Sequence, residues 1–307
     1  MTGKRGETPS TAAHMPDSRC SGAERVVQPL FSKSSIFSGL CLAGLILLTA
    51  FWLRATRPEI HLEPGNANVR WEPVDLGPIA GKGARLAGAW QLKSDNPHVG
   101  GFSGLAIDRG RLLVLTDEGM LIWIPRPGQS GAATLRPLPA VSGNPRTKIG
   151  RDSEALIRDP ERRGWWVAFE QRHQLIHYET NFTRAIQRLD IEEPSFRRNR
   201  GIEALSSDGG LRWYSERSGV SDATSLSDGR DLLLRRGIGP GGFSARISGA
   251  DGAGFALPVG PLDNAEGLAA ESLPDGATRL WIVTDNDFRP WRRTLVMAVD
   301  LAADDQR

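Results

Sequence analysis

The chain has 307 residues, a length that suits one large domain with short appendages. Its 38 basic and 36 acidic residues give a formal net charge of +2, so no strong positive field favours nucleic-acid binding. Thirty-five glycines and 20 prolines indicate many turns, while a hydrophobic fraction of 39% supports a folded core and argues against disorder. Both cysteines, Cys20 and Cys41, precede residue 60, which excludes a disulfide framework or a cysteine-bound zinc site in the main domain.

An uncharged apolar segment spans residues 34–53. A helix of this length, rising about 1.5 Å per residue, crosses a hydrocarbon core of about 30 Å. Phe51 and Trp52 stand where a cleavage site needs small residues, which favours a retained anchor over a removable signal peptide; cleavage stays the alternative. Basic residues are equally frequent on both sides, so they do not set the orientation, and the default is a short tail inside and the large domain outside.

These features predict a linear organisation of the chain. We expect an N-terminal tail (1–33), a transmembrane or signal-anchor helix (34–53), a linker (54–68), the main domain (69–301) and a C-terminal tail (302–307).

The main domain contains four similar segments. Each opens with a short phrase, continues through a turn rich in Asp, Gly or Pro, and enters an apolar strand that ends in an acid. The phrases begin at residues 103, 154, 203 and 266, so the steps are 51, 49 and 63 residues. The apolar strands are Leu112 to Asp117, Trp165 to Glu170, Leu211 to Glu216 and Leu280 to Asp285, and third strands follow at Met120 to Ile124, Leu175 to Tyr178 and Leu295 to Val299.

Repeated hairpins at this period predict an all-β fold, a β-propeller of five or six blades, after the N-terminal helix. The run Arg85 to Leu92 is expected to pair with the last strand near Val299 and close the ring. The long third step leaves room for extra strands or a long loop between Arg217 and Asp263. A β-sandwich is the alternative, but even steps favour radial repetition.

Acids recur at the two positions of each hairpin that antiparallel pairing brings to one end. In a radial arrangement they converge on one rim, where crowded carboxylates require a cation. Variable oxygen ligands favour Ca²⁺ over Mg²⁺. Acids at strand ends also cap turns or face solvent, which stays an open alternative. The predicted metal ligands are Asp117, Glu154, Glu170, Glu203, Glu216, Glu266 and Asp285, while Ser103 breaks the pattern in its repeat.

Arginines accompany these acids and can hold a phosphate or a carboxylate through paired N–H donors. Ordinary surface ion pairing, at about 0–1 kcal/mol per exposed pair, is the alternative explanation. The predicted substrate-binding residues are Arg151, Arg172, Arg200, Arg217 and Arg289, and Arg292 lies in the same loop as the last.

Other chemistries lack their sequence signatures. No G-x-S-x-G elbow, Walker loop or dinucleotide fingerprint occurs. His173 and His177 straddle a predicted turn and strand rather than one helix face, so they do not predict a zinc site. The tryptophans fall in strand-like runs and are expected in the core.

Taken together, the motifs resemble the phytase-like family described as having esterase-like activity of phytase, over roughly residues 100–300. The resemblance implies a β-propeller, usually exported from the bacterial cytoplasm, and a relation to calcium-dependent phosphate-ester hydrolysis; it assigns no residue. It is carried by Gly101 to Ala106, Leu115 to Gly119, Asp152 to Leu156, Gly201 to Leu205, Asn264 to Ala269 and Trp281 to Phe288.

We therefore expect a monomeric domain, anchored in the bacterial inner membrane through residues 34–53 and lying in the periplasm, or exported there after signal cleavage. Its expected activity is metal-assisted hydrolysis of a small anionic phosphate ester, with Ca²⁺ neutralising the transferred group and Glu203 and Glu266 as catalytic residues that orient water. The alternative is a non-enzymatic propeller that binds a ligand or an envelope partner at the same channel mouth.

Overall fold

The computed structural model describes residues 63–80, 83–129, 131–139, 150–193, 196, 201–207, 210–215 and 219–301. The predicted tails 1–33 and 302–307 and the apolar segment 34–53 lie outside these ranges. Within the described ranges, no helix has the length and apolar character needed to span a bilayer. The first strand begins at Gly65, slightly before the predicted domain start at residue 69.

The described part of the chain is all-β, as predicted, with nineteen strands. In chain order they are β1 (Gly65–Pro73), β2 (Ala84–Ser94), β3 (Phe102–Asp108), β4 (Arg111–Thr116), β5 (Met120–Ile124), β6 (Ala132–Pro137), β7 (Ser153–Arg158), β8 (Gly164–Phe169), β9 (Gln174–Glu179), β10 (Ala185–Asp190), β11 (Ile202–Ser206), β12 (Arg212–Ser215), β13 (Val220–Ser225), β14 (Asp231–Gly239), β15 (Gly242–Ser248), β16 (Gly254–Ala256), β17 (Asn264–Ser272), β18 (Thr278–Asp285) and β19 (Thr294–Leu301).

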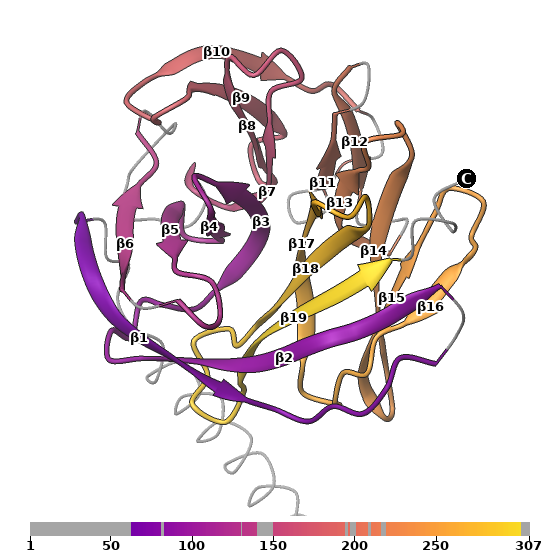
Figure 1. Cartoon of the computed structure of the whole chain (residues 1–307). Coiled ribbons are helices and arrows are strands. Elements are labelled where there is room, and N and C mark those ends of the chain that lie inside the picture. The colour runs from indigo at the N-terminus through magenta and orange to yellow at the C-terminus, as the bar shows by residue number, and fades with distance from the viewer. Residues whose placement is uncertain are drawn as a thin grey trace, which may run out of the picture. The chain divides into compact units, whose positions relative to one another are not determined.

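The described strands form four antiparallel sheets, of nine, four, two and four strands, in a propeller-like arrangement (Figure 1). Setting β1 aside divides the nine-stranded sheet in two, so the strands fall into five groups. The groups are β3 to β6, β7 to β10, β11 with β12, β13 to β16, and β17 to β19 with β2. Strands β3, β7, β11, β13 and β17, here called the first strands, each contact the next, and β17 contacts β3, so they enclose a common axis. Strands β4, β8, β12, β14 and β18 are the second strands.

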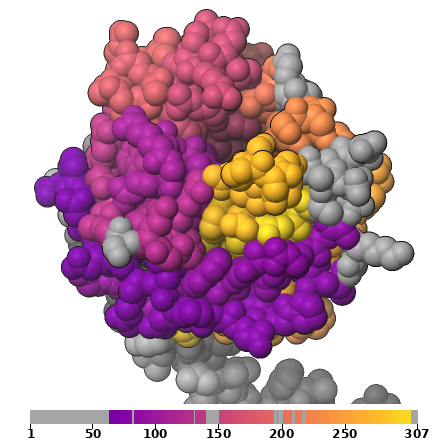
Figure 2. All heavy atoms as spheres, in the orientation of Figure 1, coloured from indigo at the N-terminus to yellow at the C-terminus, as the bar shows by residue number. Residues whose placement is uncertain are grey.

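The ends of the chain close the ring, as predicted. Strand β2 pairs antiparallel with β19, with Leu92 opposite Thr294 and Ala84 opposite Leu301. Strand β1 then pairs with β2 on one side and β6 on the other, joining the first and last groups into one nine-stranded sheet. Figure 2 shows this early segment, in indigo, lying along one side of the body next to the yellow C-terminal strands. These pairings join strands that are far apart in sequence. Backbone hydrogen bonds between those strands therefore hold the ring closed.

The long third step of the repeat has a structural explanation. The third group has only two described strands, β11 and β12, and the chain then enters β13, the first strand of a further group. The 63-residue interval therefore contains a repeat that begins near Val220 and lacks the acidic opening phrase. The apolar residues Leu232 to Leu234 lie in the second strand of this group.

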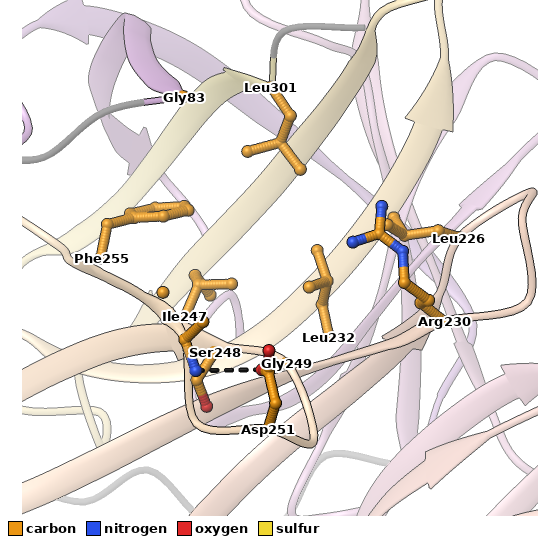
Figure 3. A pocket seen from close by; sticks show the side chains of 12 residues that line it. Gly83, Leu226, Arg230, Leu232, Ile247, Ser248, Gly249, Asp251, Phe255 and Leu301 are labelled. Atoms are coloured by element: carbon orange, nitrogen blue, oxygen red, sulfur yellow. Dashed lines mark hydrogen bonds between the residues drawn. The ribbon is translucent and has the colours of Figure 1, made fainter. Parts of the chain in front are cut away.

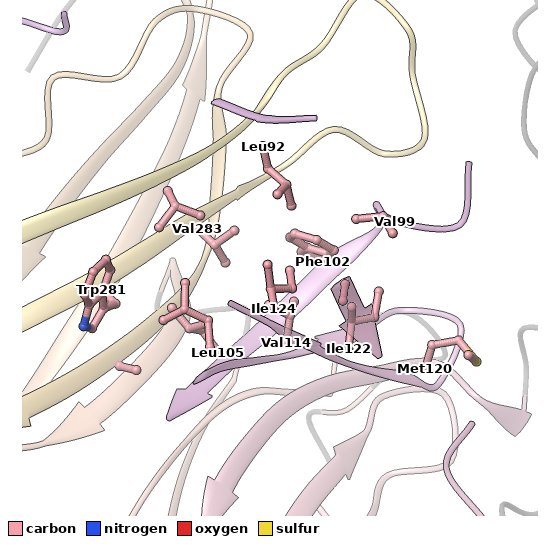
Figure 4. Close-up of a cluster of buried hydrophobic side chains, with 14 of the residues drawn as sticks. Leu92, Val99, Phe102, Leu105, Val114, Met120, Ile122, Ile124, Trp281 and Val283 are labelled. Atoms are coloured by element: carbon pink, nitrogen blue, oxygen red, sulfur yellow. The ribbon is translucent and has the colours of Figure 1, made fainter. Parts of the chain in front are cut away.

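The core lies between neighbouring groups. Leu105, Val114 and Ile122 of the first group pack in one cluster with Trp281 and Val283 of the last (Figure 4). Burying one such side chain stabilises the fold by about 1.5–3 kcal/mol. Since period-2 alternation places side chains on both faces of each sheet, central strands such as β4 are apolar on both faces.

Close packing of the first strands predicts which glycine is sensitive to substitution by a larger residue. A Cβ at Gly267 would lie 2.5 Å from Val283 and 2.8 Å from the Leu105 side chain, whereas a Cβ at Gly65 would meet no atom within 4 Å. We expect Gly267→Ala to lower the free energy of unfolding by about 1–3 kcal/mol through overpacking. Gly65→Ala is the control, with a change within about 0.5 kcal/mol. Denaturant unfolding checks this, and equal effects of the two substitutions would contradict it.

Candidate functional site

Each first strand carries a β-bulge at the same place. One residue is left without a partner in the second strand of its group, between residues that stay paired. A bulge re-aims the side chain of the extra residue and often lies beside a functional site. The five bulged residues are Ser103, Glu154, Glu203, Ser221 and Glu266.

Small residues follow the bulge because the first strands approach one another closely. A Cβ at Gly104 would lie 3.3 Å from the backbone nitrogen of Leu156, and Ala155 and Ala204 are fully buried. The fourth group departs from this, with Asp222 at the position. Its carboxylate accepts hydrogen bonds from the Leu268 nitrogen at 2.7 Å and the Ala223 nitrogen at 2.8 Å, and burial raises its pKa well above the usual value.

In β4, β8 and β18, an acid at or just after the end of the second strand occupies an equivalent backbone position. The nitrogen of Asp117 donates to the Gly101 oxygen at 2.8 Å, and that of Glu170 donates to the Asp152 oxygen at 2.8 Å. In each case the acceptor lies two residues before the bulge. In the last group Asp285 pairs with Asn264, also two residues before the bulge. The repeat therefore sets a second ring of side chains beside the first.

These two rings meet in one cavity of about 250 Å³, here called the acidic pocket. Six of the seven predicted metal ligands line it, and the seventh, Glu216, lies outside the described residues. The fold thus brings these acids to one opening, as we expected from the repeat. The pocket is lined by Gly101, Phe102, Ser103, Asp117, Glu154, Glu170, Glu203, Arg236, Glu266 and Asp285.

One half of the pocket gathers acids of the second and third groups. Asp152, Glu154 and Glu170 each offer a carboxylate oxygen within 4.8 Å of the others, a spacing that suits a metal ion. Glu170 also hydrogen-bonds Glu203, and its Oε1 accepts from the Gly201 nitrogen at 3.4 Å. Burial, and then the charge of Asp152, raise the pKa of Glu170 to about 7.

Asp152 was not among the predicted ligands. It lies two residues before Glu154, and residues two apart share a face of an extended chain, which is the signal that could have identified it. Gln171 donates from Nε2 to its Oδ2 at 2.8 Å.

The other half of the pocket joins the last group to the first. Asp285 Oδ1 accepts from the backbone nitrogens of Phe102 and Asp287, both at 2.9 Å. Burial and the charge of Asp117 raise the pKa of Asp285 to about 8. Burial also raises the pKa of Glu266 to about 7, although the neighbouring Arg236 opposes this shift.

Arg236 is the basic side chain that the sequence analysis missed. Its Nη1 donates to Asn264 Oδ1 at 3.1 Å and to Glu266 Oε1. The fourth group was not predicted from the repeat because its opening phrase, with Ser221, carries no glutamate. Aligning the strand Leu232 to Leu234 with the other second strands would have pointed to Arg236, two residues after Leu234.

Of the predicted arginines, the three that the structure describes do not line the acidic pocket. Arg151 is buried and donates to the backbone oxygens of Glu118 at 2.8 Å and Gly119 at 2.9 Å, so it fixes the turn after β4; its assignment to substrate stays a prediction. Arg172 is exposed. Arg289 contacts Asp287 at 3.1 Å and lines a neighbouring cavity of about 660 Å³. Arg200 and Arg217 lie outside the described residues.

A further cavity lies away from the acids. It has a volume of about 230 Å³ and is walled by apolar side chains that include Leu226, Leu232, Ile247 and Phe255 (Figure 3). Arg230 and Asp251 stand at its edge. Convergent charged groups mark the acidic pocket as the stronger site for polar chemistry.

His173 and His177 each pack against an aromatic ring. The ring of His177 stacks on Trp166 with centroids 4.5 Å apart, and burial lowers its pKa. His173 packs beside Phe196, with centroids 5.1 Å apart.

Comparison with known proteins confirms the family resemblance. Residues 97–215 match the phytase-like family model, described as esterase-like activity of phytase. This segment spans the first two strand groups and the described strands of the third. No curated protein sequence matches the chain.

Solved structures give weak likenesses. Glutaminyl cyclase from Myxococcus xanthus is 13% identical, with a TM-score of 0.32, covering 77% of this chain and 97% of that one. Hydrazine synthase from Kuenenia stuttgartiensis is 12% identical, with a TM-score of 0.31, covering 67% and 64%. YCF48 bound to a D1 peptide is 10% identical, with a TM-score of 0.31, covering 76% and 95%. Likenesses at this level carry no information about function.

The raised pKa values predict how stability depends on pH in the absence of metal. Glu170, Glu266 and Asp285 bind their protons more tightly in the folded chain than in the unfolded one, where carboxyl pKa values are near 4. Their contribution to stability is therefore fully present below about pH 4 and is lost as pH rises through 7 to 8. Melting temperatures measured in chelator should fall from pH 5 to pH 8.5.

The variant Glu170→Gln tests the cause, because glutamine does not ionise. We expect a smaller fall in melting temperature for this variant than for the wild type over the same range. A wild-type melting temperature that stays level or rises between pH 5 and pH 8.5 would show that the acids are not held protonated.

Proposed function

We propose that this chain, whose residues 97–215 match the phytase-like family model, hydrolyses a phosphate ester with the help of a Ca²⁺ ion in the acidic pocket. The observation that supports this is the convergence of six carboxylates on one cavity of about 250 Å³. The family match supports a hydrolase; the metal and the phosphate ester are the proposal.

The donor set fits a hard cation. Crowded carboxylates repel one another, and withdrawal from water raises the pKa values of three of them, so a bound cation relieves both costs. Asp152, Glu154 and Glu170 would hold Ca²⁺, with Glu203 adjacent through its hydrogen bond to Glu170. The ion would supply positive charge against the phosphoryl oxygens.

The chain's own acids then act on water. Glu203 and Glu266 are re-aimed into the pocket by their bulges and are placed to orient a water molecule or accept its proton. Ser103 donates its hydroxyl to the Ser153 oxygen at 2.7 Å and Ser221 donates to the Ala265 oxygen at 3.0 Å. Because these two hydroxyls are already committed to backbone oxygens, direct attack by water is favoured over a serine nucleophile.

The proposal also covers the number of blades and the cellular location of the domain. We assign the five strand groups to five blades, with the third reduced to β11 and β12 in the described part of the chain. The apolar segment 34–53 would anchor the domain on the exported side of the membrane, or be removed after export. Arg172, Arg200, Arg217 and Arg289 are proposed to attract an anionic substrate toward the mouth.

A second candidate function has one observation in its favour. Asp285 of the last group accepts a backbone hydrogen bond from Phe102 of the first, so the pocket contributes to ring closure. A cation bound there would then serve stability, and the mouth would bind a ligand or an envelope partner without turnover.

Substitution of the two glutamates tests the hydrolase. With Ca²⁺ and a phosphomonoester, we expect Glu203→Gln or Glu266→Gln to lower kcat by about 10²–10⁴, the usual contribution of a proton-transfer group. Glu161→Gln, at an exposed glutamate paired with Arg163, is the matched control and should keep wild-type turnover. Turnover that survives both pocket substitutions and added chelator would rule out this mechanism.

Chelation separates the two functions. The hydrolase loses turnover and melting temperature together when Ca²⁺ is removed. The binding protein loses melting temperature only, because it has no turnover on the phosphomonoester or carboxylester substrates in either condition.

A further inference from the structure

The fourth strand group reverses the charge of the ring. The nitrogen of Arg236 donates to the Gly219 oxygen at 3.0 Å, two residues before the bulged Ser221. This is the same backbone hydrogen bond that Asp117 and Glu170 make in their groups. The repeat thus places a guanidinium group where the first, second and fifth groups place an acid, and the same group has a serine in place of the bulged glutamate.

Only part of the hydrogen-bond donor capacity of Arg236 is taken up by its described neighbours. Its two side-chain hydrogen bonds to described residues both come from Nη1, to Asn264 and to Glu266. Nε and Nη2 have no acceptor within the described ranges, while the side chain lines the pocket and is 29% exposed. A guanidinium group presents its donors in a planar fork that matches the oxygens of a phosphate.

The pocket therefore contains both acidic side chains and a guanidinium group. Asp152, Glu154 and Glu170 form a cluster with a metal-like spacing in the second group. Arg236 belongs to the fourth group and is paired with Glu266 of the fifth. Because Glu154 and Glu170 of the cluster line the same cavity as Arg236, a ligand with anionic oxygens can meet both a cation at the cluster and the guanidinium group.

We propose that Arg236 binds the anionic oxygens of the substrate and is the residue that makes the acidic pocket selective for oxyanions. This rests on the proposed function for the presence of a cation in the pocket, and it does not require that the bound ester be hydrolysed. The ligand class is a tetrahedral oxyanion such as a phosphate group.

Binding of inorganic phosphate to the full chain tests the assignment. Titration calorimetry in saturating Ca²⁺ should show phosphate binding to the wild type and a Kd at least about 10-fold higher for Arg236→Gln, since a charge-assisted bidentate contact is lost. Arg236→Lys keeps the charge without the fork and should give an intermediate Kd.

Arg235→Gln is the matched control. Arg235 precedes Arg236 on β14 but points to the other face, where its Nε donates to Ser248 Oγ at 3.0 Å. Its replacement should leave phosphate affinity unchanged. Calcium binding, measured in the same preparations, should persist in Arg236→Gln and shows that the pocket is still folded.

The outcomes distinguish this inference from the proposed function. Phosphate affinity that is equal in the wild type and Arg236→Gln, or a wild type that binds Ca²⁺ and no phosphate, overturns the role of Arg236. Phosphate binding that depends on Arg236 in a chain that hydrolyses none of the tested esters supports the inference and leaves the hydrolase without support.

Discussion

The site depends on how closely five strands approach one axis. Glycine or alanine follows the bulge in four of the groups because a larger side chain would meet the neighbouring first strand. The bulge just before this small residue turns one side chain per strand out of the ladder. The residue that packs and the residue that lines the pocket are thus neighbours in sequence. The small residue allows the strands to meet, and the bulged residue before it lines the acidic pocket.

Bringing carboxylates together carries an electrostatic cost that the fold offsets only in part. Backbone nitrogens donate to Asp285 and to Glu170, and Arg236 pairs with Glu266. The pKa values of Glu170, Glu266 and Asp285 nevertheless stay raised, so these contacts do not fully replace water. A fold that keeps such groups together is typical of a functional site, and it makes stability, proton binding and cation binding interdependent.

The repeat also varies in ways that matter for function. The fourth group has serine and arginine where the second has two glutamates. The third group is short in the described part, so β11 and β13 lie near each other in sequence as well as around the axis. Uniform backbone geometry with non-uniform side chains makes the pocket asymmetric: the fourth group contributes a guanidinium group, and the other groups contribute acids.

The sequence by itself determined the all-β fold, the closing pair of strands and six acids of the pocket, because turn residues, strand periodicity and repeat spacing are local signals. It also carries the resemblance to the phytase-like family, whose model matches residues 97–215. Only the tertiary structure decided that Arg151 binds backbone oxygens, that Asp152 joins Glu170, and that Arg236 faces Glu266. These facts depend on which strands become neighbours around the axis, and no spacing along the chain specifies the distance between side chains that belong to different groups.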